Sequence, residues 1–386
     1  MNKNVILTEK RPIKMWLEDI EDGALQQLKN LANLPFTFKH VCAMPDCHQG
    51  YGMPIGGVLA TLGVVIPNAV GVDIGCGMYA VKTSLTQISQ EDIKTIMGKI
   101  RETVPVGFKW HDSPCCDALM PEGGSGMVVV RDEYDRAKHQ LGTLGGGNHF
   151  IEIQKGNDGH VWFMIHTGSR NLGKKVADYH NDVAKRMNAK YFSSVPKEHD
   201  LAFLPLDSVE GQRYIAEMKY CVDFALASRN LIASMVMNAI RDVTGGYMKK
   251  YYNIAHNYAS IENHYKHNVV VHRKGATLAR EGTVGIIPGS QGTKSYIVGG
   301  LGNPESFMSC SHGAGRKMGR MAAQRNLDLK AEIYALNKQG IIHSIRTKKD
   351  LDEAPSAYKD ITKVMDNQKD LVTICVELQP LAVIKG

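Results

Sequence analysis

Residues 142–154 read GTLGGGNHFIEIQ, a glycine turn that leads directly into a strand-like run over 150–154. Glycine permits left-handed backbone and lets another chemical group approach the main chain closely. His149 lies at the junction, and a histidine at a strand end faces a loop, where ligands and general bases are found. The stretch therefore predicts a strand that opens on a loop, with His149 either as a candidate ligand or as an ordinary hydrogen-bonded loop histidine.

Further glycine clusters repeat this pattern along the chain: GYGMPIGG (50–57), GVDIGCGM (71–78), GIIPGSQG (285–292) and GGLGNP (299–304). Ordinary turns between short strands would explain any one of them. Taken together, and carrying Asp, Cys, Asn or His, they favour a site that is assembled from loops on a rigid scaffold.

The segments between these loops alternate between helical and strand-like patterns without a regular βαβ repeat. Helical patterns cover 17–34, 89–104, 171–191, 208–243 and about 314–337. Strand-like runs cover 57–62, 161–165, 269–272, 282–287, 295–298 and 371–384. The order predicts a mixed α/β fold. We expect one compact domain over residues 1–386, with mixed sheets around a central site and a peripheral helical insertion at about 208–245.

Composition places the 386-residue chain among ordinary globular proteins, with 43% hydrophobic and 22% charged residues. The net charge of +7 fits an anionic partner such as a nucleotide or RNA, although many basic proteins bind neither. Eight irregularly spaced cysteines do not form a disulfide framework. The first residues lack a signal core, and the most apolar stretch, 55–72, is broken by glycines and a proline. We expect a cytoplasmic protein without a membrane span.

Asp73 and Cys76 lie three residues apart in the second glycine cluster, so one turn can direct both side chains at one ion. A soft thiolate and a hard carboxylate together suit a borderline metal. A buried cysteine beside a structural Asp turn is the alternative.

Three histidines are further ligand candidates. His149 and His166 lie at predicted strand ends, and His256, in NIAHNYAS, is expected on a helix or at its end. Their wide separation in sequence excludes a short zinc-type spacing, so only the fold can bring them together. Each one alone is also consistent with a hydrogen-bonded loop histidine.

His312 lies among small residues in SCSHGAGRKMGR (309–320). If a helix starts near Gly313, His312, Arg316 and Arg320 share one face, and the helix N-terminus adds free N–H groups for a phosphate. An imidazole nitrogen can attack phosphorus. The alternative is a helix cap with a basic, solvated face.

The sequence offers other basic candidates for phosphate contact. They are Arg170, the segment HRKGA (272–276) and Lys385, for each of which a surface charge is the ordinary explanation.

Eight motifs in a fixed order resemble the RtcB family of RNA ligases, from about residue 40 to residue 386. They are GVDIGCGM (71–78), GTLGGGNHFIEI (142–153), HTGSRNLG (166–173), AHNY (255–258), HRKGAT (272–277), IIPGSQGTKSYIV (286–298), SHGAGR (311–316) and LAVIKG (381–386). The family joins RNA 3′-phosphate or 2′,3′-cyclic phosphate ends to 5′-hydroxyl ends with GTP and manganese.

The resemblance implies a role for each matching position. His312 is implied as the nucleophile that takes GMP, and two manganese ions are implied at Asp73, Cys76, His149, His166 and His256, with Cys76 shared. Guanylate contacts are implied at Asn148, Glu152, Ser290, Ser295, Gly313, Ala314, Gly315, Tyr358 and Lys385. Contacts to RNA or triphosphate are implied at Arg170, Lys274 and Arg320.

Other functions on the same scaffold stay open at this stage. The chain could guanylate 3′-phosphate ends and seal them poorly, act as a metal-dependent phosphohydrolase, or bind RNA without catalysis. Some relatives need an activating protein partner. Cys47 and His48, in MPDCHQGYG, are not assigned as ligands, although they are expected near the site.

Overall fold

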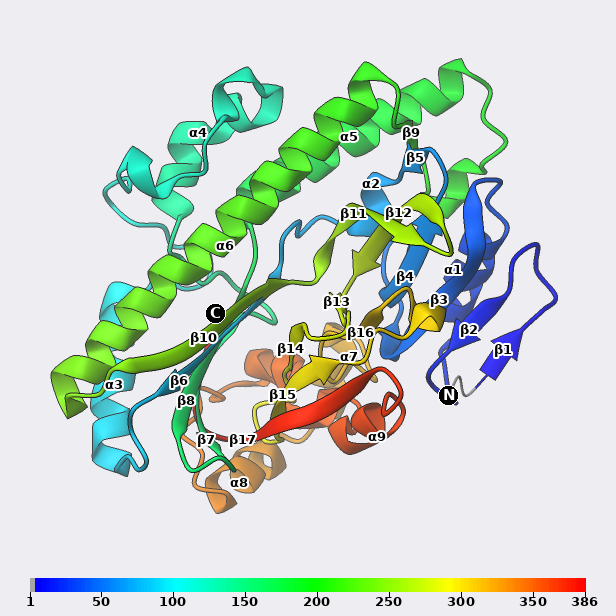
Figure 1. Ribbon diagram of the computed structural model, residues 1–386. Coiled ribbons are helices and arrows are strands. Elements are labelled where there is room, and N and C mark those ends of the chain that lie inside the picture. The colour runs from blue at the N-terminus through cyan, green and yellow to red at the C-terminus, as the bar shows by residue number, and fades with distance from the viewer. Residues whose placement is uncertain (1–3) are drawn as a thin grey trace.

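Two large β-sheets form the body of the protein, and a computed structural model describes residues 4–386 of it (Figure 1). The first sheet has seven strands, all antiparallel to their neighbours. Their order is β10 (Met248–Ala255), β6 (Gly77–Thr83), β8 (Val161–Thr167), β7 (Phe150–Gly156), β17 (Val372–Lys385), β15 (Ser295–Gly300) and β14 (Val284–Ile287).

The second sheet has six strands and is mixed, because β2 and β3 run parallel. Its order is β1 (Asn4–Ile6), β2 (Ile13–Met15), β3 (Thr37–His48), β4 (Ile55–Thr61), β12 (His267–Lys274) and β11 (Asn257–His264). Two short pairs complete the strands: β13 (Ala276–Leu278) with β16 (Ser309–Ser311), and β5 (Val64–Val65) with β9 (Leu204–Pro205).

Both faces of the seven-stranded sheet are covered, as the two-residue period of β6 illustrates. Tyr79 and Val81 pack among residues of α3 and α6, whereas Met78 and Ala80 pack on the opposite side with residues of α8. The helices are α1 (Asp22–Ala32), α2 (Pro67–Val70), α3 (Gln90–Thr103), α4 (Val128–Gln140), α5 (Arg170–Lys190), α6 (Val209–Thr244), α7 (Arg320–Asn326), α8 (Leu329–Lys338) and α9 (Ile361–Asp366).

Helix α6 runs diagonally along the seven-stranded sheet and beside α5 (Figure 1). Ser208 caps its start by accepting a hydrogen bond from the backbone N–H of Gly211, and Gly245 ends it in the left-handed conformation. Buried residues such as Phe224 and Val236 place the helix in two of the hydrophobic clusters. In residues 4–386 no helix combines the length and apolar character that a bilayer crossing requires.

The mixed α/β prediction is confirmed, and the predicted helices at 89–104, 171–191 and 208–243 match α3, α5 and α6 within about a residue. The helix predicted at about 314–337 is wrong. The chain instead forms an irregular segment up to Gly319, followed by two short helices, α7 and α8. Gly315 has a φ of +72°, which a right-handed helix does not accommodate.

Candidate active site

Strand pairing brings residues that are distant in sequence to one end of the seven-stranded sheet. The facing pairs there are Ala255–Gly77, Gly77–Thr167, His166–Phe150 and Phe150–Lys385. Because His256 follows β10, Cys76 precedes β6 and His149 precedes β7, their side chains meet His166 in one row across four strands. The prediction of a helix at His256 is wrong, since the residue lies between two strands, β10 and β11.

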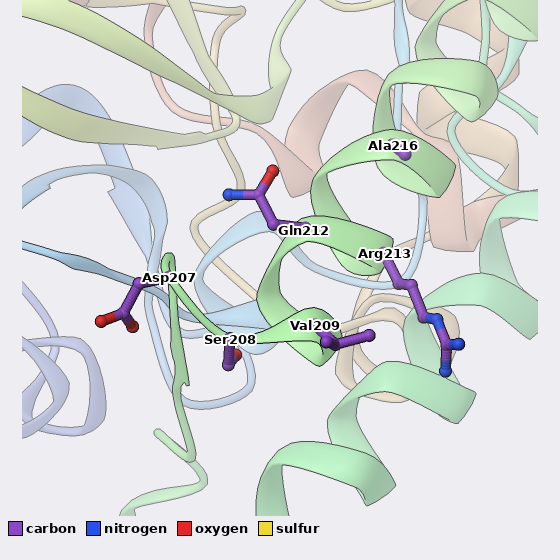
Figure 2. Close-up of a pocket in the computed structure, with 6 residues that line it drawn as sticks. All are labelled: Asp207, Ser208, Val209, Gln212, Arg213 and Ala216. Atoms are coloured by element: carbon purple, nitrogen blue, oxygen red, sulfur yellow. The ribbon is translucent and has the colours of Figure 1, made fainter.

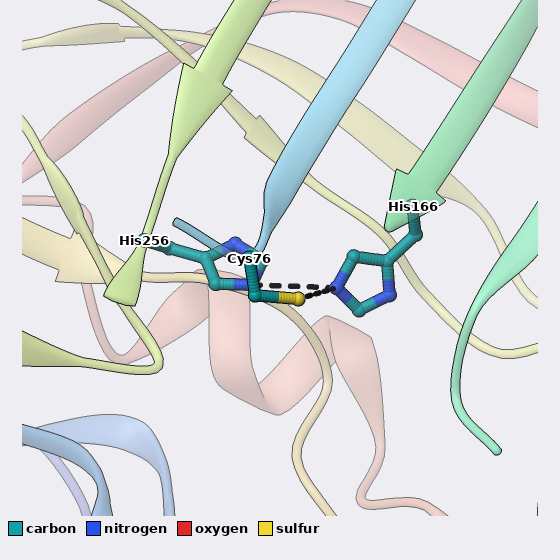
Figure 3. A group of neighbouring side chains, drawn as sticks. All are labelled: Cys76, His166 and His256. Carbon is teal, nitrogen blue, oxygen red and sulfur yellow. Dashed lines mark hydrogen bonds between the residues drawn. The ribbon is translucent and has the colours of Figure 1, made fainter. Parts of the chain in front are cut away.

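Two overlapping groups of metal-binding side chains form in this row. Cys76, His166 and His256 make one group, and Asp73, Cys76 and His149 make the other, so the Cys76 thiol belongs to both. The ligand atoms in each group lie within 4.8 Å of one another. In Figure 3 the Cys76 sulfur and the His256 ring both point at one nitrogen of His166.

The hydrogen bonds of His166 fix which of its nitrogens can bind an ion. Nδ1 lies 3.1 Å from the carbonyl oxygen of Asn148, which can only accept, so Nδ1 carries the proton. Nε2 therefore has the lone pair, and it lies 3.3 Å from both Cys76 Sγ and His256 Nε2. Sulfur and imidazole nitrogens that converge on one point are the donor set of a divalent transition metal, so the residues fit such an ion.

Burial sets the protonation of these groups. It lowers the pKa of His256 and of His166 well below 6.5, so both rings are neutral, as metal ligands must be. Burial and the Asp73 carboxylate raise the pKa of the Cys76 thiol, which a bound cation would reverse. Burial also opposes ionisation of Asp73, but the hydrogen bond and charge of His149 outweigh it and bring the pKa of Asp73 to about 2.

Close packing explains two of the glycines in the motifs. A Cβ on Gly168 would lie 2.1 Å from a carboxylate oxygen of Asp73, and one on Gly145 would lie 2.0 Å from Nη1 of Arg170. The same Nη1 lies 3.4 Å from Nδ1 of His149. Larger residues at these two positions would push the carboxylate and the guanidinium out of the site.

Arg229 of α6 forms hydrogen bonds to the backbone and to one side chain at the strand ends. Its fully buried guanidinium donates to the carbonyl oxygens of Gly75 and Thr167 at 2.9 Å and to the side chain of Asn253 at 2.7 Å. These partners flank β6, β8 and β10, so a single cation ties together the backbone around the cluster.

His312 reaches the cluster through the short β13–β16 pair. Ala276 pairs with Ser311, and its backbone N–H donates to the carbonyl oxygen of His256 at 3.2 Å. The rings of His312 and His256 consequently lie 4.7 Å apart, centre to centre.

Asp46 in β3 fixes the orientation of this ring. Its buried Oδ2 accepts from Nδ1 of His312 at 2.7 Å and from the backbone N–H groups of His312 and Gly313. Burial would raise the pKa of Asp46, but the charge and hydrogen bond of His312 outweigh it and lower the pKa. With its proton on Nδ1, the ring keeps a lone pair on Nε2, which is the nitrogen that a nucleophile needs.

The expected helix face of His312, Arg316 and Arg320 is not formed. His312 lies in the irregular segment, whereas Arg320 is the first residue of α7. Both guanidinium groups contact the buried carboxylate of Glu353, Arg316 through Nη1 at 3.1 Å and Arg320 through Nε at 3.3 Å. The two arginines thus converge on an acidic side chain.

The carboxylate of Glu353 also contacts two residues that were predicted to bind the guanylate, Tyr358 and Lys385. The hydroxyl of Tyr358 donates to Oε2, and Nζ of Lys385 lies 3.5 Å from the same oxygen. The backbone oxygen of Glu353 accepts from Gln291, which brings the loop of Ser290 to the same place. One carboxylate is therefore surrounded by three cations and a phenol.

Two further predicted guanylate contacts, Asn148 and Glu152, lie just before β7 and on it. The carbonyl oxygen of Asn148 accepts from both His166 and Lys385. Glu152 is buried on β7, and burial raises its pKa to about 8 against the opposing effect of Gln154.

Two serines and the small residues after His312 shape nearby loops. Ser295 accepts from the backbone N–H of Gly289, and Ser290 contacts the hydroxyl of Thr293 at 3.0 Å. Ala314 is buried, and the carbonyl oxygen of Gly315 accepts from Lys359.

Lys274 is buried, whereas a lysine that contacts a phosphate at the surface would be exposed. Its Nζ donates to the carbonyl oxygens of Tyr51 and Asn68, and burial lowers its pKa to about 7. The side chain joins the loop of Tyr51 to helix α2.

Sequence reasoning missed Asp46, Arg229 and Glu353. Asp46 lies directly before Cys47 and His48 in MPDCHQGYG, but 266 residues separate it from His312, so no local pattern links the two. Arg229 lies within a helix and Glu353 in a short 3-10 segment, where no local pattern distinguishes either from a surface charge.

Figure 2 shows a surface pocket at the start of α6. It is lined by Asp207, Ser208, Val209, Gln212, Arg213 and Ala216. Of these only Ser208, the N-cap of α6, is described above, and none is a candidate site residue.

Comparison with known proteins agrees with the motif resemblance. The family model described as "tRNA-splicing ligase RtcB" matches residues 27–123 and 118–386. The chain is 38% identical to the RNA-splicing ligase RtcB of Escherichia coli strain K12, with 100% of both chains aligned. It is 33% identical to the tRNA-splicing ligase RtcB of Thermococcus kodakarensis, with 95% of this chain and 92% of the relative aligned. The chain belongs to the RtcB family.

Proposed function

We propose that this protein is an RNA ligase that joins a 3′-phosphate or 2′,3′-cyclic phosphate end to a 5′-hydroxyl end, using GTP and Mn²⁺. The names of the relatives support RNA ligation. The observation that carries the proposal is the 4.7 Å contact between the His312 ring and His256, a member of the Cys76 cluster. A nucleophile candidate and a metal-binding cluster thus share one site.

The first step forms a covalent bond between His312 and GMP. Nε2 attacks the α-phosphorus of GTP, the bond to the β-phosphate oxygen breaks, and pyrophosphate leaves. Asp46 holds the ring and stabilises the charge that develops on it. We assign two Mn²⁺ ions to Asp73, Cys76, His149, His166 and His256, where they would neutralise phosphate charge and orient the α-phosphorus.

The second and third steps transfer GMP to RNA and then release it. An oxygen of the RNA 3′-phosphate attacks the phosphorus on His312, the N–P bond breaks, and the RNA end becomes a diphosphate-linked guanosine. The 5′-hydroxyl then attacks the RNA phosphorus, a phosphodiester forms, and GMP leaves. A cyclic phosphate is first opened by water to the 3′-phosphate.

The polar residues around Glu353 and on β7 are assigned to the guanylate. They are Asn148, Glu152, Ser290, Ser295, Gly313, Ala314, Gly315, Tyr358 and Lys385. Arg170 and Arg320 are assigned to phosphate groups, since each packs against the glycine run 145–147. Lys274 is assigned to a phosphate of RNA or of the triphosphate. The alternative is a structural role, in which its Nζ holds the carbonyl oxygens of Tyr51 and Asn68. A cytoplasmic location and an activating protein partner are part of the same proposal.

Label transfer from α-labelled GTP tests the first step. The protein is incubated with labelled GTP and Mn²⁺, Mg²⁺ or Zn²⁺ in parallel. Protein-bound label that survives base and is lost in acid is measured, because a histidine phosphoramidate is stable in base and hydrolyses in acid. We expect a labelled protein with Mn²⁺ and none in His312→Ala. Absence of label with every metal would favour a phosphohydrolase or a non-catalytic RNA-binding protein.

The product formed from RNA separates the ligase from an end-capping enzyme. With GTP and Mn²⁺, a 3′-phosphate strand and a 5′-hydroxyl strand are expected to give one joined strand. Accumulation of guanosine-capped 3′ ends without joining would instead identify a guanylyltransferase that seals poorly.

A further inference from the structure

Residues 105–111, PVGFKWH, form a loop that is bonded to the glycine run ahead of His149. The backbone N–H of Gly107 donates to the carbonyl oxygen of Gly145 at 2.9 Å, and Leu144 donates to Pro105 at the same distance. Val106 and Gly145 also form a parallel β-bridge. The loop is therefore fixed to the backbone that positions His149.

Little separates this loop from the metal cluster. Gly145 contacts the loop on one side, and the Arg170 guanidinium takes the place of its side chain on the other. That guanidinium lies 3.4 Å from Nδ1 of His149. One glycine and one guanidinium thus span the distance from the loop to a candidate metal ligand.

The loop displays two aromatic rings with a lysine between them. Phe108 is 104% exposed, so its ring contacts almost nothing, and Trp110 is 46% exposed. The other two tryptophans of the chain, Trp16 and Trp162, are buried. Lys109 is exposed, and in the part of the chain that the structure describes it has no ion-pair partner. Neither ring belongs to a hydrophobic cluster of residues 4–386, so both are available to a ligand.

Two aromatic rings beside a free cation form the kind of surface that binds single-stranded nucleic acid. Bases stack on the rings whatever their sequence, and the ammonium group pairs with the backbone phosphates. We propose that Phe108, Lys109 and Trp110 form a stacking platform for the unpaired nucleotides next to the RNA end that reacts. This inference rests on the proposed RNA ligase function.

The shape of the platform favours a strand over a free nucleotide or a second nucleotide site. Small-molecule sites are concave and surround their ligand, whereas the Phe108 ring projects into solvent. A single stack on a projecting ring holds a free nucleotide weakly. For a strand whose end is already held in the metal site, the same stack is an intramolecular contact and adds to the overall affinity.

Substitution by leucine tests the role of the rings, because it removes the flat π-face and keeps an apolar side chain. Phe192 is the matched control: it is 93% exposed and follows α5, a 21-residue helix that starts at Arg170 and spans about 30 Å. We expect Phe108→Leu and Trp110→Leu each to raise the KM for RNA about tenfold. GMP transfer to His312 without RNA and the KM for GTP stay unchanged, and Phe192→Leu behaves as the wild type.

Direct binding keeps this test independent of catalysis. Short dye-labelled RNA strands that end in a 3′-phosphate or begin with a 5′-hydroxyl are titrated with each protein variant and binding is read by fluorescence anisotropy, so the two arms identify which end approaches the platform. An abasic nucleotide is then moved along the strand. At one position it is expected to weaken binding to wild-type protein about tenfold and to have no further effect on Phe108→Leu.

Equal RNA affinity for wild type, Phe108→Leu and Trp110→Leu would overturn the platform and leave the loop as a surface for a protein partner. Failure of the ligase proposal gives a different result, because GMP transfer to His312 would then be absent from the wild-type protein itself.

Discussion

The candidate metal ligands and the proposed nucleophile are held by different kinds of structure. Cys76, His166 and His256 lie at the ends of paired strands, where the register of β10, β6 and β8 fixes their spacing. His312 lies in an irregular segment, and Asp46 fixes both its ring and its backbone. A register is distributed over many residues, whereas the position of the nucleophile depends on one carboxylate. Single substitutions are therefore expected to affect the two regions differently.

Removal of the functional atoms gives the largest expected effect and separates the two regions. Cys76→Ala and His312→Ala are each expected to reduce GMP transfer and ligation by at least ~10³-fold. Only Cys76→Ala removes a shared ligand, so it alone is expected to lower the bound Mn²⁺, measured by elemental analysis of dialysed protein. Full activity in either variant, or equal metal loss in both, would contradict the division.

Asp46→Asn tests the dependence of His312 on one carboxylate. The amide oxygen can still accept from Nδ1, but the negative charge is lost, so a ~10²-fold slower single-turnover labelling of His312 is expected. Bound Mn²⁺ should stay at the wild-type level. A wild-type labelling rate would show that the charge of Asp46 has no part in the step.

Arg229→Met tests the residue that fixes the strand ends, as Asp46 fixes His312. The substitution removes the guanidinium that donates to the carbonyl oxygens of Gly75 and Thr167. We therefore expect the free energy of unfolding to fall by about 3 kcal/mol. Arg213→Met, on an exposed position of the same helix, is the control and is expected to change it by less than about 0.5 kcal/mol. Urea unfolding measures both; similar values would refute the anchoring role.

Glu152 provides a test through pH, in which the change per pH unit is smaller than the loss expected for Arg229→Met. Its folded pKa of about 8 exceeds the ordinary 4.5, so the folded state binds the extra proton between these values. The resulting stability is complete below about pH 4.5 and is lost as pH rises through 8. In metal-free protein, the unfolding free energy of wild type relative to Glu152→Gln is expected to fall by up to ~1.4 kcal/mol per pH unit in this window. Parallel pH profiles would exclude a raised pKa.

The comparison also explains how far the sequence alone could go. The helices α3, α5 and α6 are predictable because their helical periodicity is uninterrupted. The candidate ligands lie in short motifs at predicted strand ends, but their role as a metal-binding set follows from the resemblance to the family and not from their spacing. Their convergence could not be derived, since it depends on which strands pair. His256 was placed on a helix because its neighbours suggested one, whereas pairing of Ala255 with Gly77 makes the segment a strand.

The segment after His312 was misjudged for a local reason and a distant one. Gly315 adopts a positive φ, and its carbonyl oxygen accepts from Lys359 instead of from a helical neighbour. Glu353, which attracts both arginines, lies far along the chain. A helical spacing of charges could not reveal a carboxylate that arrives from another part of the fold.

The position of β17 has a consequence for how the protein matures. The strand comes after all the others in sequence but lies inside the sheet, between β7 and β15, and 237 residues separate Lys385 from its partner Asn148. Closing so long a loop is slow compared with forming local helices. During that delay we expect the thiol of Cys76 to be open to oxidants and to competing ions, and the yield of active protein on refolding to depend on the reductant present.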